Sequence, residues 1–571
     1  MERLMCGIAG IIGNKASQKQ LDAMLEAQAH RGPDATGRYM KGDTFLGHNR
    51  LAIIDLSPEA NQPFFSHDSR FIIVFNGEIY NYIELKKQLA STYSFTTNSD
   101  TEVLLAAYQA WGDACLSKLN GMFAFAIWDT KEQRLFAARD RFGVKPFYYT
   151  VVENTFYFAS EIKSLFAAGI SKTPNESVWA SYFAYGSYGM PNETFWEGIH
   201  QLQGGHFLTL DDSEVAIARW YDFEEAVKKY DIALSFEIVK ARYLQLLDDS
   251  IRLRFRADVP IGFNVSGGLD SSALLALVNR LEEGENIEAF TFYTGDDRYD
   301  ELPWVEGLIA HTKNPLTKIQ LEVDHLASLA EVMAIQQDEP YGGVPTVAYG
   351  ELFKEARSKG VKVLLDGQGM DEQWAGYDYY TKTSDNVIQG VSKSPFRTGV
   401  LTADFFAKAK KPIYPTPFKD RILNLQYRDL FYTKIPRALR FNDRVSMQFS
   451  TELREPFLDY RLVEFAFAQP LTYKIHDGVQ KYLLRAIVSE YLSDSITYAP
   501  KRPLQTPQRE WLAEDLKDWV ENTIEGLKDT SWFDYEQLQE EWTRYVNGDQ
   551  DSSFHIWQWI NASLLVSLRH N

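Results

Sequence analysis

Hydrophobic and polar positions alternate in short runs along the first part of the chain. The runs are rich in β-branched and aromatic residues and are bounded by Gly, Asn or Asp, a pattern typical of β-strands. Clear examples lie at residues 71–75, 122–128 and 156–158. Helical periodicity is rarer and marks residues 18–29, 82–89 and 101–111. The pattern predicts an α+β domain of layered antiparallel sheets with helices, which we assign to residues 6–220.

The periodicity changes near residues 224–235. A long amphipathic helix is predicted over residues 236–255, followed by a short apolar strand at 259–265, a Gly-rich turn and a helix at 270–280. Further strands are predicted at residues 289–293 and 361–365, and the chain after about residue 405 is mostly helical in pattern. Strands that alternate with helices predict an α/β doubly wound parallel sheet with a helical C-terminal part, over residues 235–571.

Composition supports a folded protein of more than one domain. The 571 residues exceed one ordinary core, and 45% are hydrophobic while 24% are charged. The net charge of -19 opposes non-specific binding to nucleic acids and to anionic membranes. Two cysteines, Cys6 and Cys115, form neither a disulfide framework nor a zinc site. With no signal peptide or spanning segment in the sequence, we expect a cytoplasmic enzyme without nucleic-acid or membrane partners.

Cys6 opens the segment Cys6-Gly-Ile-Ala-Gly10, which alone is weak evidence of chemistry. Four downstream segments change its meaning: Arg31-Gly-Pro-Asp34, Gly47-His-Asn-Arg50-Leu-Ala-Ile-Ile-Asp55, Phe75-Asn-Gly-Glu-Ile-Tyr80 and Ser99-Asp100-Thr-Glu102. Together they closely resemble the glutaminase domain of the asparagine synthetase family, whose members are N-terminal-nucleophile amidotransferases. The resemblance spans nearly all of the first 165 residues.

The resemblance implies a role for each matching residue. The Cys6 thiolate attacks the side-chain amide of glutamine, and the α-amine of Cys6 takes the thiol proton. Asn76 and the backbone N–H of Gly77 stabilise the oxyanion. Arg50 binds the α-carboxylate of glutamine, and Glu78 and Asp100 bind its α-ammonium. The pocket is lined through main chain by Leu51, Ala52, Ile53 and Ile54. His30 and His48 are weaker candidates for the base, and Cys115 is expected to be a packing residue.

The position of Cys6 departs from the family pattern. In the family this cysteine follows the initiator methionine directly, whereas residues 1–5 precede it here. An amide nitrogen cannot act as a base, so Cys6 needs a free α-amine. We expect residues 1–5 to be absent from the active enzyme, either because translation starts at Met5 or because the leader is removed.

The segment Ser266-Gly-Gly-Leu-Asp-Ser-Ser272 follows a predicted strand and opens a predicted helix. Two glycines free the backbone so that successive N–H groups can face a phosphate, and the helix N-terminus adds a positive dipole. The segment resembles the pyrophosphate loop of ATP pyrophosphatases. It predicts an ATP site that comprises Ser266, Gly267, Gly268, Leu269, Asp270, Ser271 and Ser272.

A second acidic segment, Leu364-Leu-Asp-Gly-Gln-Gly-Met-Asp371-Glu372, follows another apolar strand and should lie at the same edge of the sheet. Resemblance assigns Asp366 and Gly367 to AMP recognition and Asp371, with Asp270, to Mg²⁺. By resemblance, Asn264 and Phe292 contact the nucleotide mainly through backbone. The segment Gln480-Lys-Tyr-Leu-Leu-Arg485 matches the family's lysine motif, so that Lys481 would stabilise charge during adenylation. ATP and Mg²⁺ are the expected cofactors.

The acceptor of ammonia is left open by the sequence. Aspartate is the leading prediction, but Gln368 stands where asparagine synthetases often have an acid, and Glu372 or Glu339 would have to compensate. The segment Lys501-Arg-Pro-Leu-Gln-Thr-Pro-Gln-Arg509 resembles relatives thought to amidate uronic-acid sugars of surface polysaccharides, which is the alternative acceptor. A catalytically silent regulatory relative is disfavoured because the functional residues are intact. The family commonly forms homodimers, so a homodimer is expected from resemblance.

Overall fold

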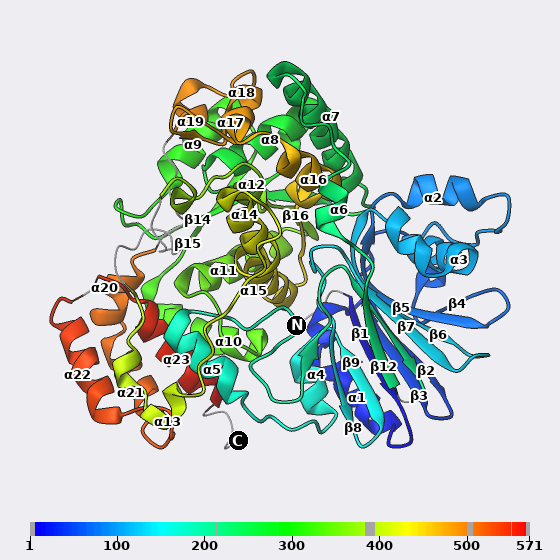
Figure 1. Cartoon of the computed structure of the whole chain (residues 1–571), viewed down its shortest axis with the longest axis horizontal. Coiled ribbons are helices and arrows are strands. Elements are labelled where there is room, and N and C mark those ends of the chain that lie inside the picture. Colours follow the sequence, from blue (N-terminus) through cyan, green and yellow to red (C-terminus); the bar gives the residue numbers. More distant parts are fainter. Residues whose placement is uncertain are drawn as a thin grey trace.

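The computed structural model of the chain describes residues 6–212, 214–282, 284–382, 394–499, 506–549 and 551–566. Figure 1 shows a β-rich N-terminal half beside a larger half in which helices surround a central sheet. Among the described residues, no helix is long and apolar enough to cross a membrane.

The N-terminal half is built from two antiparallel six-stranded sheets. The first has the order β10 (His200–Gln201), β8 (Tyr148–Val152), β9 (Thr155–Ala159), β1 (Gly7–Ile12), β3 (Thr44–Arg50), β2 (Ala35–Lys41). The second has the order β12 (Glu214–Arg219), β11 (His206–Asp211), β7 (Arg134–Arg139), β6 (Gly121–Asp129), β5 (Phe71–Ile79), β4 (Phe64–Phe65).

The alternation of side chains along each strand explains the layers. Ile72 and Val74 of β5 lie in one hydrophobic cluster with Ile8 of β1, which places them between the sheets. Ile73 and Phe75 point the other way and pack with α2 (Tyr82–Leu89) and α3 (Asp100–Trp111). The outer face of the first sheet packs against α1 (Gln18–Ala27) and α4 (Ile162–Ala167). The result is a four-layer arrangement of helices, two sheets and helices.

The C-terminal half contains a five-stranded parallel sheet with the order β15 (Leu316–Gln320), β14 (Ala289–Tyr293), β13 (Ile261–Asn264), β16 (Val363–Leu365), β17 (Glu452–Arg454). The hydrophobic cluster on one face includes residues of α7 (Phe236–Arg254), α8 (Leu269–Glu282) and α18 (Tyr482–Val488). The cluster on the other face includes residues of α10 (Leu326–Gln337), α11 (Val344–Ser358) and α15 (Lys434–Gln448). Both faces are covered, as parallel sheets require.

Further helices surround these sheets. They are α5 (Glu176–Tyr185), α6 (Phe223–Val227), α9 (Leu302–Thr312), α12 (Met370–Gln373), α13 (Ala403–Phe406), α14 (Arg421–Phe431), α16 (Tyr460–Ala468), α17 (Leu471–Lys474), α19 (Asp494–Thr497), α20 (Gln508–Ala513), α21 (Lys517–Glu525), α22 (Tyr535–Val546) and α23 (Phe554–Val566). A short hairpin pairs β18 (Ile475–His476) with β19 (Val479–Gln480).

The predicted fold class is confirmed, and the element bounds differ in detail. The strand predicted at 71–75 continues to Ile79, because Asn76, Gly77 and Glu78 pair with β6 instead of forming a turn. The strand predicted at 259–265 is shorter, and the helix predicted at 270–280 is longer by a residue or two at each end.

The two halves share a buried interface. Leu51, Ile53 and Ile54, which follow β3, pack in one cluster with Val363 of β16 and Met447 of α15. The segment expected to line the glutamine pocket therefore rests directly on the parallel sheet of the other half.

Candidate active site

Cys6 lies at the start of β1, beside the segment that follows β3. Its Sγ donates to the carbonyl of Leu51 at 3.5 Å and accepts from the N–H of the same residue at 3.4 Å. Arg31 fixes the backbone by donating from Nε to the Cys6 carbonyl at 3.0 Å. Burial raises the pKa of the Cys6 thiol to about 12, against the lowering effect of the Leu51 hydrogen bond. The thiol is neutral at pH 7 and needs a base. Residues 1–5 lie outside the described residues, so the expected loss of the leader stays a prediction.

Asn76 and Gly77 lie on β5, between the edge strand β4 and strand β6 of the second sheet. Asn76 is 2% exposed, and its Nδ2 lies 3.5 Å from the hydroxyl of Ser160. Gly77 has a φ of 146°, and a Cβ there would lie 2.0 Å from the carbonyl oxygen of Met122. Only glycine fits this position, so the backbone N–H of residue 77 is held in place by β6.

Three carboxyl groups gather near Cys6. Glu78 and Asp100 come from β5 and α3, and Glu452 comes from β17 of the other half. Burial, with added repulsion from Glu452, raises the pKa of Glu78 well above its ordinary range and that of Asp100 to about 7, although the N–H of Ile79 donates to Asp100 at 2.8 Å. Oε2 of Glu78 is buried without a hydrogen-bond partner in the described part of the chain. The group is therefore suited to receive a cation.

Arg454 of β17 is the cation nearest to this group. It is fully buried, donates to Glu452 at 2.7 Å and lies 3.6 Å from Glu78. Its Nη1 also donates to the carbonyls of Arg254 and Arg256, at 2.8 and 2.9 Å. A strand of the second half thus forms the floor beneath the first half's cysteine site.

Arg50, at the end of β3, is held rigidly. It donates to the carbonyl of Ser57 at 2.7 Å, to Oδ1 of Asn61 at 2.8 Å and to the carbonyl of Asp55. Three of its five N–H donors are used in this way, which orients the guanidinium fork. The N–H of Ala52 donates to Asp34 at 2.8 Å, so the Leu51–Ile54 backbone is fixed as well.

The two weaker base candidates are engaged elsewhere. Burial lowers the pKa of His48 to about 3, and its Nε2 bonds the carbonyl of Phe75 at 3.0 Å. His30 is paired with Glu161 at 3.1 Å. Cys115 is fully buried in the cluster beneath α3, as expected of a packing residue.

The predicted pyrophosphate loop lies between β13 and α8. Gly267 has a φ of 70° and packs against Trp304, and Ser266, Gly268 and Asp270 are half-buried at the carboxyl edge of the sheet. The hydroxyl of Ser271 receives a hydrogen bond from the N–H of Ser266 at 3.3 Å. Leu269 begins the helix.

Ser272 differs from the other loop residues. Its side chain is fully buried, and its N–H donates to the carbonyl of Gly268 at 3.0 Å within the first turn of α8. The hydroxyl of Ser272 has no hydrogen-bond partner among the described residues, whereas that of Ser271 donates to the carbonyl of Gly268 at 3.2 Å; Ser266 is the half-buried serine of the loop and the most accessible to a phosphate.

Lys481 brings the two predicted metal-binding carboxylates together. Its Nζ lies 2.6 Å from Asp270 and 2.7 Å from Asp371. Burial alone would lower the pKa of Lys481, but the two carboxylates overcome this effect and raise it. A Cβ at Gly376 would lie 1.9 Å from Asp371 and 2.2 Å from Cε of Lys481, so a glycine at 376 is required for this contact.

The described residues contain no group of three or more His, Cys, Asp or Glu side chains that could hold a metal ion alone. Mg²⁺ is ordinarily held by one or two carboxylates together with phosphate oxygens. Asp270 and Asp371 fit that donor set, with the remaining ligands coming from ATP and water.

The predicted nucleotide residues cluster beside this triad. Asp366 follows β16, is buried, and accepts from the N–H of Gly367 at 2.5 Å. Burial raises the pKa of Asp366 to about 6, against hydrogen bonds from Gly367 and Asn264. Phe292 is half-buried with its ring 5.9 Å from that of Tyr349.

Two acids were candidates to compensate for Gln368, which is half-buried. Glu339 is fully engaged, since it accepts from the N–H of Phe195 at 2.9 Å and pairs with Arg440 at 3.3 Å. Glu372 lies next to Asp371 and accepts from the hydroxyl of Tyr377 at 2.6 Å. Burial and the charge of Asp371 raise the pKa of Glu372 to about 7. Residues 500–505, which include most of the predicted uronic-acid motif, lie outside the described residues.

Sequence reasoning assigned no role to Glu452, Arg454 or Gly376. The closely spaced charges of Glu452-Leu-Arg-Glu455, which stand within an apolar stretch, are the signal in the sequence that could have indicated Glu452 and Arg454. No signal in the sequence indicated Gly376, because the need for glycine there comes from contacts that include Lys481, which is distant in the chain.

Comparison with known proteins agrees with this geometry. A glutamine amidotransferase domain matches residues 5–221, and an asparagine synthase domain matches residues 242–569. Asparagine synthetase [glutamine-hydrolyzing] 3 of Bacillus subtilis is 32% identical over 92% of this chain and 91% of its own length. Asparagine synthetase [glutamine-hydrolyzing] 1 of the same organism is 28% identical over 97% of this chain and 95% of its own length. Amidase chry2 of Gibberella zeae is 28% identical over 89% of this chain and 90% of its own length. The chain therefore belongs to the asparagine synthase family and carries a glutamine amidotransferase domain ahead of its synthase domain.

Proposed function

We propose that this chain is a glutamine-hydrolysing asparagine synthetase, which adenylates aspartate with ATP and amidates it with ammonia from glutamine. The observation that carries the proposal is the pairing of two equipped sites, one around Cys6 and one around Lys481, across a shared buried interface. The domains are proposed to span residues 6–220 and 235–571. A cytoplasmic location and a homodimer belong to the same proposal, and light scattering of the purified protein tests the dimer.

In the first reaction, the α-amine of Cys6 accepts the thiol proton and the thiolate attacks the side-chain carbonyl carbon of glutamine. Asn76 and the N–H of Gly77 donate to the oxyanion, and its collapse releases ammonia and leaves a thioester that water hydrolyses to glutamate. Arg50 orients the substrate α-carboxylate, while Glu78 and Asp100 receive its α-ammonium. The raised pKa values of these two acids fit carboxyl groups that Arg454 compensates only in part, so that the α-ammonium of the substrate would stabilise their ionised forms.

In the second reaction, a carboxylate oxygen of the acceptor attacks the α-phosphorus of ATP and pyrophosphate leaves. Ammonia then attacks the acyl carbon of the adenylate, and AMP leaves. Backbone and hydroxyl donors of residues 266–271 bind the phosphates, and Lys481 stabilises the negative charge that develops. Asp270 and Asp371 would hold Mg²⁺, which supplies charge neutralisation at the pyrophosphate when it is bound.

Two kinds of charged side chain near Asp371 support aspartate as the acceptor. Glu372 can receive the α-ammonium of aspartate, in place of an acid at residue 368. Lys434 lies 5.0 Å from the ring centre of Tyr377, the residue that bonds Glu372, and Arg437 is one helical turn further along α15. Among the described residues neither cation has a carboxylate within ion-pair distance. They are therefore suited to the α-carboxylate of aspartate.

A second acceptor class is favoured by one observation. Gln368 is neutral, half-buried and stands between Asp366 and Asp371 in the sequence, and a carboxylate acceptor without an α-amine, such as a uronic-acid sugar, requires no acid there. The relative named as an amidase is consistent with acceptors other than aspartate in the family.

Product analysis separates these acceptors. Purified enzyme is incubated with ¹⁵N-amide glutamine, ATP, MgCl₂ and either aspartate, UDP-glucuronic acid or no acceptor, and pyrophosphate and amide products are measured. We expect pyrophosphate release and labelled asparagine with aspartate. An amide formed from the uronic acid alone moves the assignment to the second class. If neither aspartate nor the uronic acid elicits pyrophosphate release, the result would support a catalytically silent relative.

A further inference from the structure

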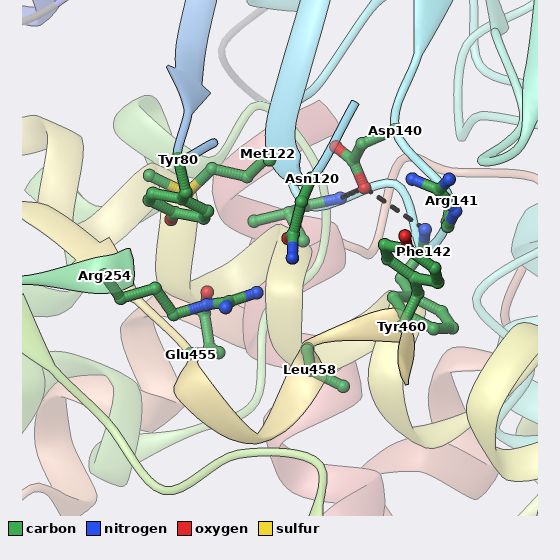
Figure 2. A pocket seen from close by; sticks show the side chains of 12 residues that line it. Tyr80, Asn120, Met122, Asp140, Arg141, Phe142, Arg254, Glu455, Leu458 and Tyr460 are labelled. Atoms are coloured by element: carbon green, nitrogen blue, oxygen red, sulfur yellow. Dashed lines mark hydrogen bonds between the residues drawn. The ribbon is translucent and has the colours of Figure 1, made fainter. Parts of the chain in front are cut away.

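A small cavity lies between the two halves of the molecule (Figure 2). Its volume is about 20 Å³, and its lining includes Tyr80, Asn120 and Met122 from the first half and Arg254, Glu455 and Leu458 from the second. A space of this size holds about one water-sized molecule.

The walls of the cavity adjoin both active sites. Met122 of β6 is the direct cross-strand partner of Glu78, and its carbonyl is the atom that makes glycine necessary at residue 77. On the opposite side, Leu458 packs against Gly369, where an added Cβ would lie 2.5 Å from its Cδ2. Gly369 directly follows Gln368. A molecule in the cavity is therefore adjacent to the neighbours of both sites.

Glu455 is the unusual member of the lining. It is 4% exposed, and within the described part of the chain its carboxyl group has neither a hydrogen-bond nor an ion-pair partner. The two cations that act on Glu455 are engaged by other acids, since Lys145 pairs with Glu452 at 3.8 Å and Arg254 with Asp459 at 3.0 Å. A buried carboxyl group without a partner is costly, so a ligand with N–H donors would stabilise it.

The surroundings of Glu455 raise the pKa of its carboxyl group into the range near neutral pH. Burial raises its pKa to about 8, Lys145 and Arg254 oppose this effect, and Asp366 and Asp443 add to it. Asp140 and Arg141 also line the cavity, with Asp140 bonded to the N–H of Phe142. A group in this state can exchange its proton with a base that enters the cavity.

We propose that the carboxyl group of Glu455 is a binding station for ammonia between the two active sites, an inference that rests on the proposed function. Ammonia that arrives takes the proton of Glu455, which gives an ammonium ion paired with the carboxylate. On departure the proton returns to the Glu455 oxygen, and neutral ammonia leaves with the lone pair that attacks the adenylate. The step consumes no proton, and nitrogen is held against loss to solvent without being trapped as ammonium.

The first test measures transfer. The enzyme is given ¹⁵N-amide glutamine, unlabelled ammonium chloride, ATP and acceptor, and the labelled amide formed per glutamate released is compared between variants. We expect Glu455→Gln and Glu455→Leu to keep glutamate release and ammonium-dependent amidation within about twofold, while the labelled fraction falls roughly threefold or more. Glu464→Gln, which alters a buried acid bonded to Tyr221 at 2.8 Å, is the matched control and keeps full transfer. An unchanged labelled fraction in Glu455→Gln overturns the proposal.

The second test needs no acceptor. Crystals of the full chain are soaked in rubidium chloride at about pH 9, where Glu455 is ionised and Rb⁺ substitutes for ammonium, and anomalous diffraction is measured. We expect one rubidium site beside Glu455, absent from the Glu455→Gln variant. A water molecule only, or equal density in both proteins, counts against the station. Rubidium at Glu455 without amide formation from any acceptor would overturn the proposed function and leave the station standing.

Discussion

The two active sites handle buried charge in different ways. Around Cys6, the acids Glu78 and Asp100 lie in a buried pocket whose nearby cations, Arg454 and Lys145, also pair with Glu452, and the pKa values of both acids are raised. Around Lys481, the lysine is compensated by Asp270 and Asp371, and its pKa is raised as well. The first site has an excess of negative charge that glutamine's α-ammonium can neutralise. In the second, one cation is shared by two carboxylates, so Lys481 compensates Asp270 and Asp371 only in part.

The largest expected effect concerns the base at Cys6. A chain that keeps residues 1–5 has an amide nitrogen at Cys6 and a thiol whose pKa is about 12, so glutaminase activity should fall by roughly a thousandfold or more. Ammonium-dependent amidation should persist, because the second site is untouched. Intact-mass spectrometry and glutamate release are measured together, and cleavage directly before Cys6 should restore activity. Full activity with residues 1–5 attached would falsify the α-amine mechanism.

Replacing Lys481 removes the cation that Asp270 and Asp371 share. Lys481→Met leaves Asp270 and Asp371 facing each other without their cation, and pyrophosphate release should fall by about a hundred- to a thousandfold. Lys481→Arg should recover only part of this loss, since a planar fork cannot reproduce the position of Nζ. Glutamate release serves as the internal control and should be unchanged. Wild-type pyrophosphate release in Lys481→Met would remove the lysine from the mechanism.

Arg454 links the two sites, and its removal should affect the first. Arg454→Met removes the cation nearest to Glu452 and Glu78 and leaves only Lys145, 3.8 Å from Glu452, which should cost about 3–5 kcal/mol of stability and raise the KM for glutamine. Thermal unfolding and glutaminase kinetics are the measurements. Arg461→Met, which removes a cation paired with Asp459 and Asp249 further from Glu78, is the matched control. Unaltered KM and stability in Arg454→Met would show that the floor of the pocket is not needed.

The smallest effect is a pH dependence of glutamine binding. The raised pKa of Asp100, about 7 against 3.8, means that the folded protein holds this proton more tightly than the unfolded chain. Between those values this group's contribution to stability decreases as pH rises, and the proton must leave when the α-ammonium binds. Affinity for glutamine should therefore weaken below pH 7, by up to about tenfold per pH unit.

Calorimetry on the Cys6→Ala variant measures this binding without turnover. Asp100→Asn should bind more weakly than the parent at every pH and with a shallower profile, because only Glu78 is left to titrate in the pocket. Glu102→Gln, in the same helix turn, should keep the slope of the wild type, because Glu102 bonds Thr96 and Thr97 and not the pocket. A wild-type affinity that does not change between pH 6 and pH 8 would contradict the role of Asp100.

Features formed by consecutive residues could be predicted from the sequence. The loop at residues 266–272 was predictable because its strand, glycines and helix are consecutive, and the structure places it at the edge of the parallel sheet. The extension of β5 through Asn76, Gly77 and Glu78 was not, because polar residues and a glycine indicate a turn unless the partner strand β6 is known. The contact of Arg454 with Glu78 joins residues far apart in the chain, which no local periodicity can reveal. The position of Glu455 in the cavity could not be predicted for the same reason, because the lining residues are far apart in the chain.

Strand β17 sets a limit on how such enzymes can be recombined. A chimera that joins the first 220 residues of one relative to the remainder of another would retain every residue named around Cys6 on the amidotransferase side. It would nevertheless receive residues 452 and 454, which approach Glu78, from a foreign parent. The smallest exchangeable unit that keeps the contacts of Glu78 is thus discontinuous: the amidotransferase domain together with the three residues of edge strand β17 in its neighbour.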